Sequence, residues 1–365
     1  MSEWQTFCLK DLGKIVGGAT PSTNNPKNYG NKIAWITPKD LSTLQGRYIK
    51  KGSRSISRLG FKSCSCVLLP KHAILFSSRA PIGYVAIAKK RLCTNQGFKS
   101  IIPNKKIYFE FLYYLLKYHK DNISNIGGGT TFKEVSGATL GLFKVKIPPT
   151  YYEQQKIAHT LSILDQKIEN SHKINELLHT LAYKIYEYYF KYKPKNAKLE
   201  QIIIENPKSS IMVKNAQKTQ DKYPFFTSGD NILSYPKAII DGRNCFLNTG
   251  GNAGIKFYVG KASYSTDTWC ICANEFSDYL YLLLSSIKTY INQSFFQGTS
   301  LKHLQKNLLK KYPIYMPSAH EIKKFNQIIM PLLTLISINT RTSKKLEQIR
   351  DFLLPLLLKQ QVKPQ

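Results

Sequence analysis

"EQQKIAHTLSILDQKIENSHKINELLHTLAYKIYEYYF", residues Glu153–Phe190, contains no Gly and no Pro, and its apolar residues recur at helical spacing. A Pro-Pro pair at 148–149, three residues before this stretch, ends the preceding segment. This pattern predicts one long helix of roughly 36 residues, which would extend for about 54 Å at 1.5 Å per residue.

Steps of four and three residues alternate along this helix, as in the seam of a coiled coil. The seam consists of Ile157, Leu161, Leu164, Ile168, Ser171, Asn175, Leu178, Ala182, Ile185 and Tyr189. A second seam, 168 residues downstream, consists of Phe325, Ile329, Leu332, Ile336, Asn339, Ser343, Leu346, Arg350, Leu353 and Leu357. Both seams turn polar at the same two central steps, which can fix the register of paired helices.

The segments upstream of the two helices also repeat. "FLYYLL" (Phe111–Leu116) falls on "YLYLLL" (Tyr279–Leu284), and "GGGTTFKEVSGATLGLFKVKIPP" (127–149) resembles "FQGTSLKHLQKNLLKKYPIYMP" (296–317). The offset changes from 169 to 168 within the latter pair. By contrast, "GGATPSTNNPKNYGNKIAWITPKDL" (17–41) has only the loose counterpart "YPFFTSGDNI". An internal duplication follows, of a globular block and a long helix.

Each block contains short strand-like runs between turns rich in Gly, Pro, Ser and Asn, and then a helix. Examples are "AILFS" and "GYVAIA" in the first block and "NCFLNT" and "IKFYVG" in the second. The fold class expected is therefore α+β. The expected segments are block 1–150, helix 151–192, block 193–318 and helix 319–365.

The charge is concentrated in the two blocks. The chain carries 53 Lys and Arg against 22 Asp and Glu, a net charge of +31. Residues 1–150 have a net charge of +18 and residues 191–318 of +9, whereas the helix at 151–190 has −1. So large an excess favours a polyanionic partner, with nucleic acid first and an anionic membrane surface second.

Membrane insertion is not expected. The longest apolar runs, "IIMPLLTLISI" and "FLLPLLL", are too short to span a bilayer, and each contains a Pro. The amino terminus lacks the layout of a signal peptide. We therefore expect a cytoplasmic protein.

Metal binding is not expected either. The seven cysteines include two CxC pairs, Cys64/Cys66 and Cys270/Cys272, and no CxxC. Alternation along a strand already places residues i and i+2 on one face, so buried thiols explain these pairs. His159, His172 and His179 are too far apart in the first long helix for an i,i+4 metal pair.

Catalytic motifs are incomplete. "IPPTY" (147–151) resembles the Asn/Asp-Pro-Pro-Tyr motif of amino-methyltransferases, but Ile147 cannot accept the hydrogen bond that this chemistry needs. "GIKFYVGKAS" (254–263) has the wrong glycine spacing for a phosphate loop. The sequence therefore favours a binding protein over an enzyme.

The order and duplication of these segments resemble the specificity (S) subunit of Type I restriction-modification systems. The similarity covers the whole chain and rests on the block opening at 17–41 and on "GGGTTFKEVS…LFKVKIPPTYYEQQKIAHTLSILDQKIE". The second half departs from the pattern. Ser318 and His320 replace Thr150 and Tyr152, and Pro331 is expected to interrupt the second helix.

The resemblance implies two target-recognition domains beside two long antiparallel coiled-coil helices, each domain reading one half of a split double-stranded DNA target. It also implies two modification (methyltransferase) subunits, which carry the S-adenosylmethionine chemistry, and restriction/translocase subunits as partners. This chain itself would bind no cofactor and catalyse no reaction. The alternative is a coiled-coil RNA-binding or scaffold protein without DNA sequence specificity.

Base contacts are expected from Arg and polar side chains on loops, because Arg suits bidentate contact with guanine. In the first block the candidates are Lys39, Arg47, Arg54, Arg58, Arg79, Asn95, Gln96, Thr130 and Lys133. In the second block they are Ser228, Asn231, Arg243, Asn244, Asn252, Thr299, Lys302 and His303.

Overall fold

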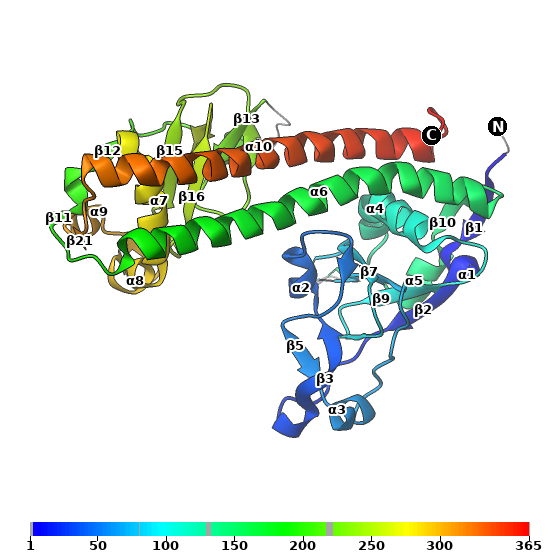
Figure 1. Cartoon of the computed structure of the whole chain (residues 1–365). Helices are drawn as coiled ribbons and strands as arrows, with labels where there is room; N and C mark the ends of the chain where they lie inside the picture. Colours follow the sequence, from blue (N-terminus) through cyan, green and yellow to red (C-terminus); the bar gives the residue numbers. More distant parts are fainter. Residues whose placement is uncertain (1–2, 80, 129–132, 217–221, 365) are drawn as a thin grey trace. The chain divides into compact units, whose positions relative to one another are not determined.

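A computed structural model describes residues 3–79, 81–128, 133–216 and 222–364 (Figure 1). The chain forms two compact units. Unit 1 comprises residues 1–170 and 345–365, and unit 2 comprises residues 171–344. Each unit therefore contains one globular block and a half of each long helix, so the units divide inside the helices and not at their ends.

Unit 1 is built around a five-stranded sheet of order β2-β9-β6-β7-β4. Its central strands are apolar and buried, as expected for strands covered on both faces. The strands are β2 (Gly13–Gly17), β4 (Tyr48–Ile49), β6 (Ile74–Phe76), β7 (Val85–Ala88) and β9 (Lys99–Pro103). All neighbours are antiparallel except β4 and β7.

A second sheet of unit 1 has the order β5-β3-β8, and a two-stranded pair closes the block. The strands are β3 (Tyr29–Ile36), β5 (Arg54–Ile56) and β8 (Cys93–Thr94), with β1 (Gln5–Cys8) paired to β10 (Lys144–Ile147). Short helices connect them: α1 (Leu9–Leu12), α2 (Pro38–Ser42), α3 (Arg58–Lys62) and α5 (Gly137–Leu142).

The helix α4 (Phe109–Asn125) joins the sheet of unit 1 to the long helices (Figure 1). Its buried residues form one cluster with Ile74 and Ile87 of the sheet, Leu161 of α6 and Leu357 of α10. Burial of apolar surface on both sides of α4 fixes the block on its half of the helix pair.

Unit 2 repeats this plan. Its sheets have the orders β12-β18-β15-β16 and β14-β13-β17. The strands are β12 (Ile204–Glu205), β13 (Tyr223–Phe226), β14 (Leu233–Tyr235), β15 (Arg243–Asn248), β16 (Ile255–Val259), β17 (Ser263–Tyr264) and β18 (Thr268–Cys272). The remaining elements are α7 (Ser277–Ser286), α8 (Lys288–Ser294), the hairpin β19–β20 (Phe296–Gln297 and His303–Leu304), α9 (Lys306–Lys310), and β11 (Ala197–Lys198) paired with β21 (Pro313–Ile314).

Strand pairing shows which positions correspond in the two units. Ile74 of β6 lies opposite Ile87 and Ile101, and Cys245 of β15 lies opposite Phe257 and Ile271. Ile74 and Cys245 thus occupy the same place in two sheets that share the order of four strands, while β4 of unit 1 has no counterpart in the described sheet of unit 2. The duplication inferred from the sequence is a duplication of topology.

The long helices are α6 (Tyr151–Tyr186), which continues as a π-helical turn over Glu187–Lys191, and α10 (Ala319–Leu358). The interruption expected at Pro331 is wrong, because α10 runs through Pro331 and Pro355 without a break. Packing of an apolar face outweighs the loss of single backbone hydrogen bonds here.

The two long helices are antiparallel within each unit. In unit 1, Arg350 of α10 bonds Asp165 of α6. In unit 2, Asn175 bonds Thr340, and the rings of Phe190 and Phe325 lie 4.9 Å apart. The seam residues Ile157, Leu161, Leu164, Ile168, Leu178, Ile185, Phe325, Ile329, Leu332, Ile336, Leu346 and Leu353 are all buried or half-buried.

Candidate nucleic-acid interface

The predicted contact residues of unit 1 fall into three groups. Exposed side chains are Lys39, Arg54, Arg58, Gln96 and Lys133, whereas Arg79 and Asn95 are half-buried. Thr130 lies outside the described residues. Arg47 is the one member of the third group, the buried side chains among these predicted residues that the structure describes.

The exposed arginines lie on the second sheet and its connections. The Arg54 guanidinium lies over the ring of Tyr29, 4.4 Å from its centroid, and Arg58 begins helix α3. Stacking on Tyr29 orients Arg54 and leaves its N–H donors at the surface. Both side chains can therefore reach a ligand.

Arg79 is held by Glu134. The Glu134 carboxylate lies 3.6 Å from Arg79 and accepts a hydrogen bond from Lys99 at 3.2 Å. The Arg79 side chain remains about one third exposed. Glu134 thus orients the Arg79 side chain, which stays accessible at the surface.

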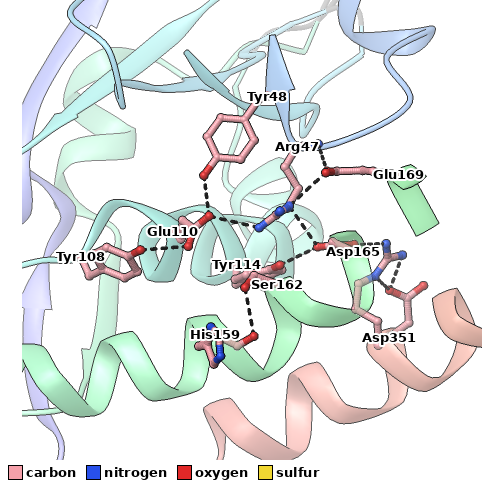
Figure 2. A network of polar contacts seen from close by, with 11 residues as sticks. Arg47, Tyr48, Tyr108, Glu110, Tyr114, His159, Ser162, Asp165, Glu169 and Asp351 are labelled. Atoms are coloured by element: carbon pink, nitrogen blue, oxygen red, sulfur yellow. Dashed lines mark hydrogen bonds and ion pairs between the residues drawn. The ribbon is translucent and has the colours of Figure 1, made fainter. Parts of the chain in front are cut away.

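The prediction that Arg47 contacts DNA is wrong, because its side chain is only 4% exposed and its donors are used inside unit 1 (Figure 2). The guanidinium bonds Glu110 of α4 and Glu169 of α6, each at 3.1 Å, and its Nε lies 3.9 Å from Asp165. The backbone amide of Arg47 also donates to Glu169, at 2.8 Å.

This network continues into α10. The buried Asp165 carboxylate accepts hydrogen bonds from the Tyr114 hydroxyl at 2.5 Å and from Arg350 at 2.7 Å. Burial, together with the charge of Asp165, raises the pKa of Tyr114, which keeps the hydroxyl protonated as a donor. We refer to Arg47, Glu110, Asp165, Glu169 and Arg350 as the unit 1 charge network. It links the sheet, α4, α6 and α10.

In unit 2, Asn231, Asn252, Thr299, Lys302 and His303 are exposed. Ser228 is half-buried, and its hydroxyl donates to the carbonyl of Asp267. The structure therefore leaves the first five side chains available at the surface, while Ser228 serves the local turn.

The predictions for Arg243 and Asn244 are wrong. Arg243 forms two hydrogen bonds of 2.5 Å with the buried Asp278 and donates to the Thr334 hydroxyl of α10 at 3.0 Å. Asn244 is buried; its amide donates to the carbonyl of Asp241 and its side-chain oxygen accepts from Asn206. These residues hold the fold of unit 2.

Sequence reasoning missed that one arginine in each block binds a carboxylate at the start of a helix. The signal was present: Glu110 and Asp278 are separated by the repeat offset of 168 and lie in the first turns of α4 and α7. A carboxylate that recurs beside a buried apolar helix calls for a buried cation.

Other chemistry is not assembled in the described part of the chain. There, no group of three His, Cys, Asp or Glu side chains is arranged to hold a metal ion, and all seven cysteines are free thiols. Among the same residues, no helix is long and apolar enough to cross a membrane. Each globular block carries a net positive charge, +18 over residues 1–150 and +9 over residues 191–318.

Comparisons with known proteins agree on one family. The sequence profile described as "Type I restriction modification DNA specificity domain" matches residues 1–179 and 195–348. The MjaIX specificity subunit of Methanocaldococcus jannaschii, a type I restriction enzyme subunit, is 33% identical over 403 residues, covering 98% of this chain and 93% of that protein.

Two further similarities differ in extent. The HindI type I specificity subunit of Haemophilus influenzae is 31% identical over 177 residues, 46% of this chain and 37% of that protein. The crystal structure of an S subunit from M. genitalium has a TM-score of 0.63 at 17% identity, covering 97% of this chain and 96% of that one. The latter similarity concerns the fold.

Proposed function

The chain belongs to the type I restriction-modification DNA specificity family and has a role in DNA sequence specificity; we propose that its two globular blocks each read one half of a split DNA target. Each block carries a net positive charge and lies in a separate compact unit. A protein with two separate DNA-binding modules contacts two separate half-sites.

The observation that carries this proposal is a repeated scaffold with different loops. The strand orders match between the units except for β4, which among the described strands only unit 1 has. The connection from β3 to β6 spans residues 37–73 and contains β4, whereas that from β13 to β15 spans residues 227–242. Matching frames with loops of different length and sequence would place different side chains on different bases.

Affinity would come mainly from the phosphate backbone. The block at 1–150 has a net charge of +18 and that at 191–318 of +9. Neutralising phosphates releases counterions, so binding should weaken steeply with salt. Direct contacts to base edges would then supply the sequence preference.

Catalysis would belong to other subunits. We propose that this chain recruits two modification subunits, which bind S-adenosylmethionine, and restriction/translocase subunits, and acts with them in the cytoplasm without a cofactor of its own. The relatives are named as subunits of type I restriction enzymes. Exposed apolar residues support docking of such partners, namely Ile174, Leu177 and Leu181 of α6 and Tyr188 of the π-helical turn that follows it.

Co-expression with candidate modification subunits, followed by genome-wide mapping of modified bases, tests the proposal. We expect one motif of two specific parts separated by unspecified bases, absent from cells that lack this chain. An uninterrupted motif would contradict the assignment of half a target to each block. Competition between duplex DNA and RNA separates this function from that of an RNA-binding scaffold.

A further inference from the structure

Lys256 connects two turns of unit 2. It lies on β16, and its side chain is half-buried. The ammonium donates to the backbone carbonyl of Thr227 at 2.8 Å and to the side-chain oxygen of Asn248 at 3.2 Å. Thr227 directly follows β13 and Asn248 ends β15, so one side chain joins the ends of two strands that belong to different sheets.

Each of these strand ends leads into a turn that carries a predicted base contact. The β13–β14 turn (residues 227–232) contains Asn231, and the β15–β16 turn (residues 249–254) contains Asn252. Both side chains are exposed. An asparagine amide can bond the edge of adenine through two hydrogen bonds, which requires that the side chain is held at a defined place.

Asn248 extends the connection into the β15–β16 turn. Its side-chain oxygen accepts from Lys256, and its side-chain nitrogen donates to the backbone carbonyl of Asn252 at 3.1 Å. A Cβ at Gly254 would lie 2.3 Å from this nitrogen, so the turn packs closely against the amide of Asn248. Lys256, Asn248 and Asn252 thus form a continuous chain of hydrogen bonds.

Unit 1 has an alanine at the position that corresponds to Lys256. Lys256 lies opposite Phe246, and the corresponding pair in unit 1 is Ala86 and Leu75. Ala86 is buried. A sheet of this strand order therefore does not need a lysine here, and burial of a lysine costs hydration free energy that an apolar side chain does not lose.

Unit 1 stabilises the turns after β3 and β6 locally. The amide of Thr37, directly after β3, donates to the carboxylate of Asp40 at 2.8 Å. Ser77, the equivalent of Asn248, accepts from the amide of Tyr84 at 2.8 Å. Each of these bonds lies within one connection, whereas in unit 2 one lysine couples two turns.

We propose that Lys256 is a positioning residue for DNA recognition by unit 2, which holds the two turns at a fixed separation so that Asn231 and Asn252 contact two bases of one half-site. This inference rests on the proposed function, in which unit 2 reads one half of the target. The three donors of a lysine ammonium allow it to bond both turns at once. Ala86 cannot donate, so recognition by unit 1 should not depend on such a connection.

Lys256→Met in the full chain tests this role, because methionine keeps most of the apolar length of the side chain and removes the donors. The probe is a pool of random-sequence duplexes from which the preferred motif is selected. We expect discrimination to fall about ten-fold at two positions of one half-site, the same two that Asn231→Ala and Asn252→Ala relax singly. The other half-site should keep its preference.

Further variants show whether Lys256 acts through these asparagines. Lys256→Met should add little to the loss that Asn252→Ala causes at the same base, because coupled residues have non-additive effects. Asn248→Asp keeps the acceptor for Lys256 and removes the donor to Asn252, so it should relax the base read by Asn252 and retain the one read by Asn231. Lys261→Met removes an exposed lysine of the same block and should leave the motif unchanged.

A motif that is unaltered by Lys256→Met would overturn the proposal, and so would a loss shared equally by both half-sites or one that adds fully to that of Asn252→Ala. Hydrogen exchange gives a readout that does not depend on the motif. In Lys256→Met, exchange should become faster at 227–232 and 249–254 and stay slow in β15 and β18, and unchanged exchange in both turns would equally contradict the role. The proposed function fails differently: the unaltered chain would then select no motif, while exchange would still report on the turns.

Discussion

The two units attach their globular blocks to the long helices with different chemistry. In unit 1, Arg47 bonds two carboxylates from two helices and lies near a third. In unit 2, Arg243 bonds one carboxylate, Asp278, and a threonine hydroxyl of α10. The carboxylates at the starts of α4 and α7 correspond, but the arginines do not, because Arg243 begins β15 and Arg47 precedes β4.

Strand pairing shows which residue of unit 1 corresponds to Arg243 of unit 2. Arg243 lies two residues before Cys245, so its counterpart in unit 1 is His72. His72 stacks on the ring of Phe109, with centroids 3.9 Å apart, and the cation is supplied by Arg47 beside β4. Both units thus place an arginine beside the carboxylate at the start of the helix, but the two arginines are at non-equivalent positions of the sequence.

Removal of Arg47 should have the largest effect on stability. Arg47→Ala takes the cation from the half-buried Glu110 and Glu169 and leaves the buried Asp165 with Arg350 alone, and loss of one partner of a buried ion pair costs about 3–5 kcal/mol. Hydrogen exchange measured peptide by peptide should show this loss in unit 1. Arg91→Ala, an exposed arginine of the same block, should change the free energy of unfolding by less than about 0.5 kcal/mol. A cost below about 1 kcal/mol for Arg47→Ala would show that the network does not hold the block.

Arg243→Ala should cost less, about 2–3 kcal/mol, because only one buried carboxylate loses its partner. Burial raises the pKa of Asp278 even with Arg243 present, so protonation of Asp278 can relieve the variant. The cost should therefore shrink as the pH is lowered, and hydrogen exchange in unit 2 at two pH values measures it. A cost equal to that of Arg47→Ala, independent of pH, would mean that the two attachments are alike.

Arg79→Ala should act on recognition more than on folding. The Arg79–Glu134 pair is about one third exposed, so its loss should cost less than about 1 kcal/mol of stability. Loss of a base contact should reduce discrimination between the preferred duplex and the random pool by about 1–3 kcal/mol. In unit 2 the corresponding residue is Gly250, which has no side chain to lose. Discrimination equal to that of the unaltered chain would refute this role for Arg79.

The start of α10 should give the smallest effect and one that depends on pH. The Glu321 carboxylate accepts hydrogen bonds from the amide of Ser318 at 2.9 Å and from the hydroxyl of Tyr315 at 2.8 Å, and these bonds lower its pKa to about 2. The stabilisation is complete above the unfolded pKa of 4.5 and is lost as the pH falls through about 2.

Glu321→Gln should accordingly destabilise the first turn of α10 by about 1 kcal/mol at pH 7. The difference from the unaltered chain should disappear on acidification towards pH 2, as measured by hydrogen exchange or thermal unfolding. A difference that is constant from pH 7 to pH 3 would show that the charge of Glu321 is not involved.

The sequence predicted the long helices, because apolar periodicity over ten seam positions is a strong local signal. It also predicted the α+β duplication wherever the offset stays near 168. It gave only a loose match between 17–41 and 223–232, whereas strand pairing shows that Trp35 corresponds to Phe225, because they pair in parallel with Cys93 and Ser263. These residues are 190 apart in sequence, since the connections that follow them differ in length, and a constant offset does not align them.

Roles of individual arginines were not predictable from residue type. Arg47 and Arg54 lie seven residues apart in a basic stretch of the chain, yet Arg47 is buried and Arg54 is exposed over Tyr29. The difference arises from carboxylates that α4 and α6 bring to Arg47 from more than sixty residues away. The carboxylate that recurs at Glu110 and Asp278 indicates that a cation is needed, but it does not indicate which arginine supplies it.

The central claim is that each block reads its own half of the target. Replacement of residues 193–318 by the corresponding segment of another family member, followed by mapping of modified bases, tests it most directly. The account predicts that one half of the motif changes while the other half stays. A change in both halves, or in neither, would contradict it.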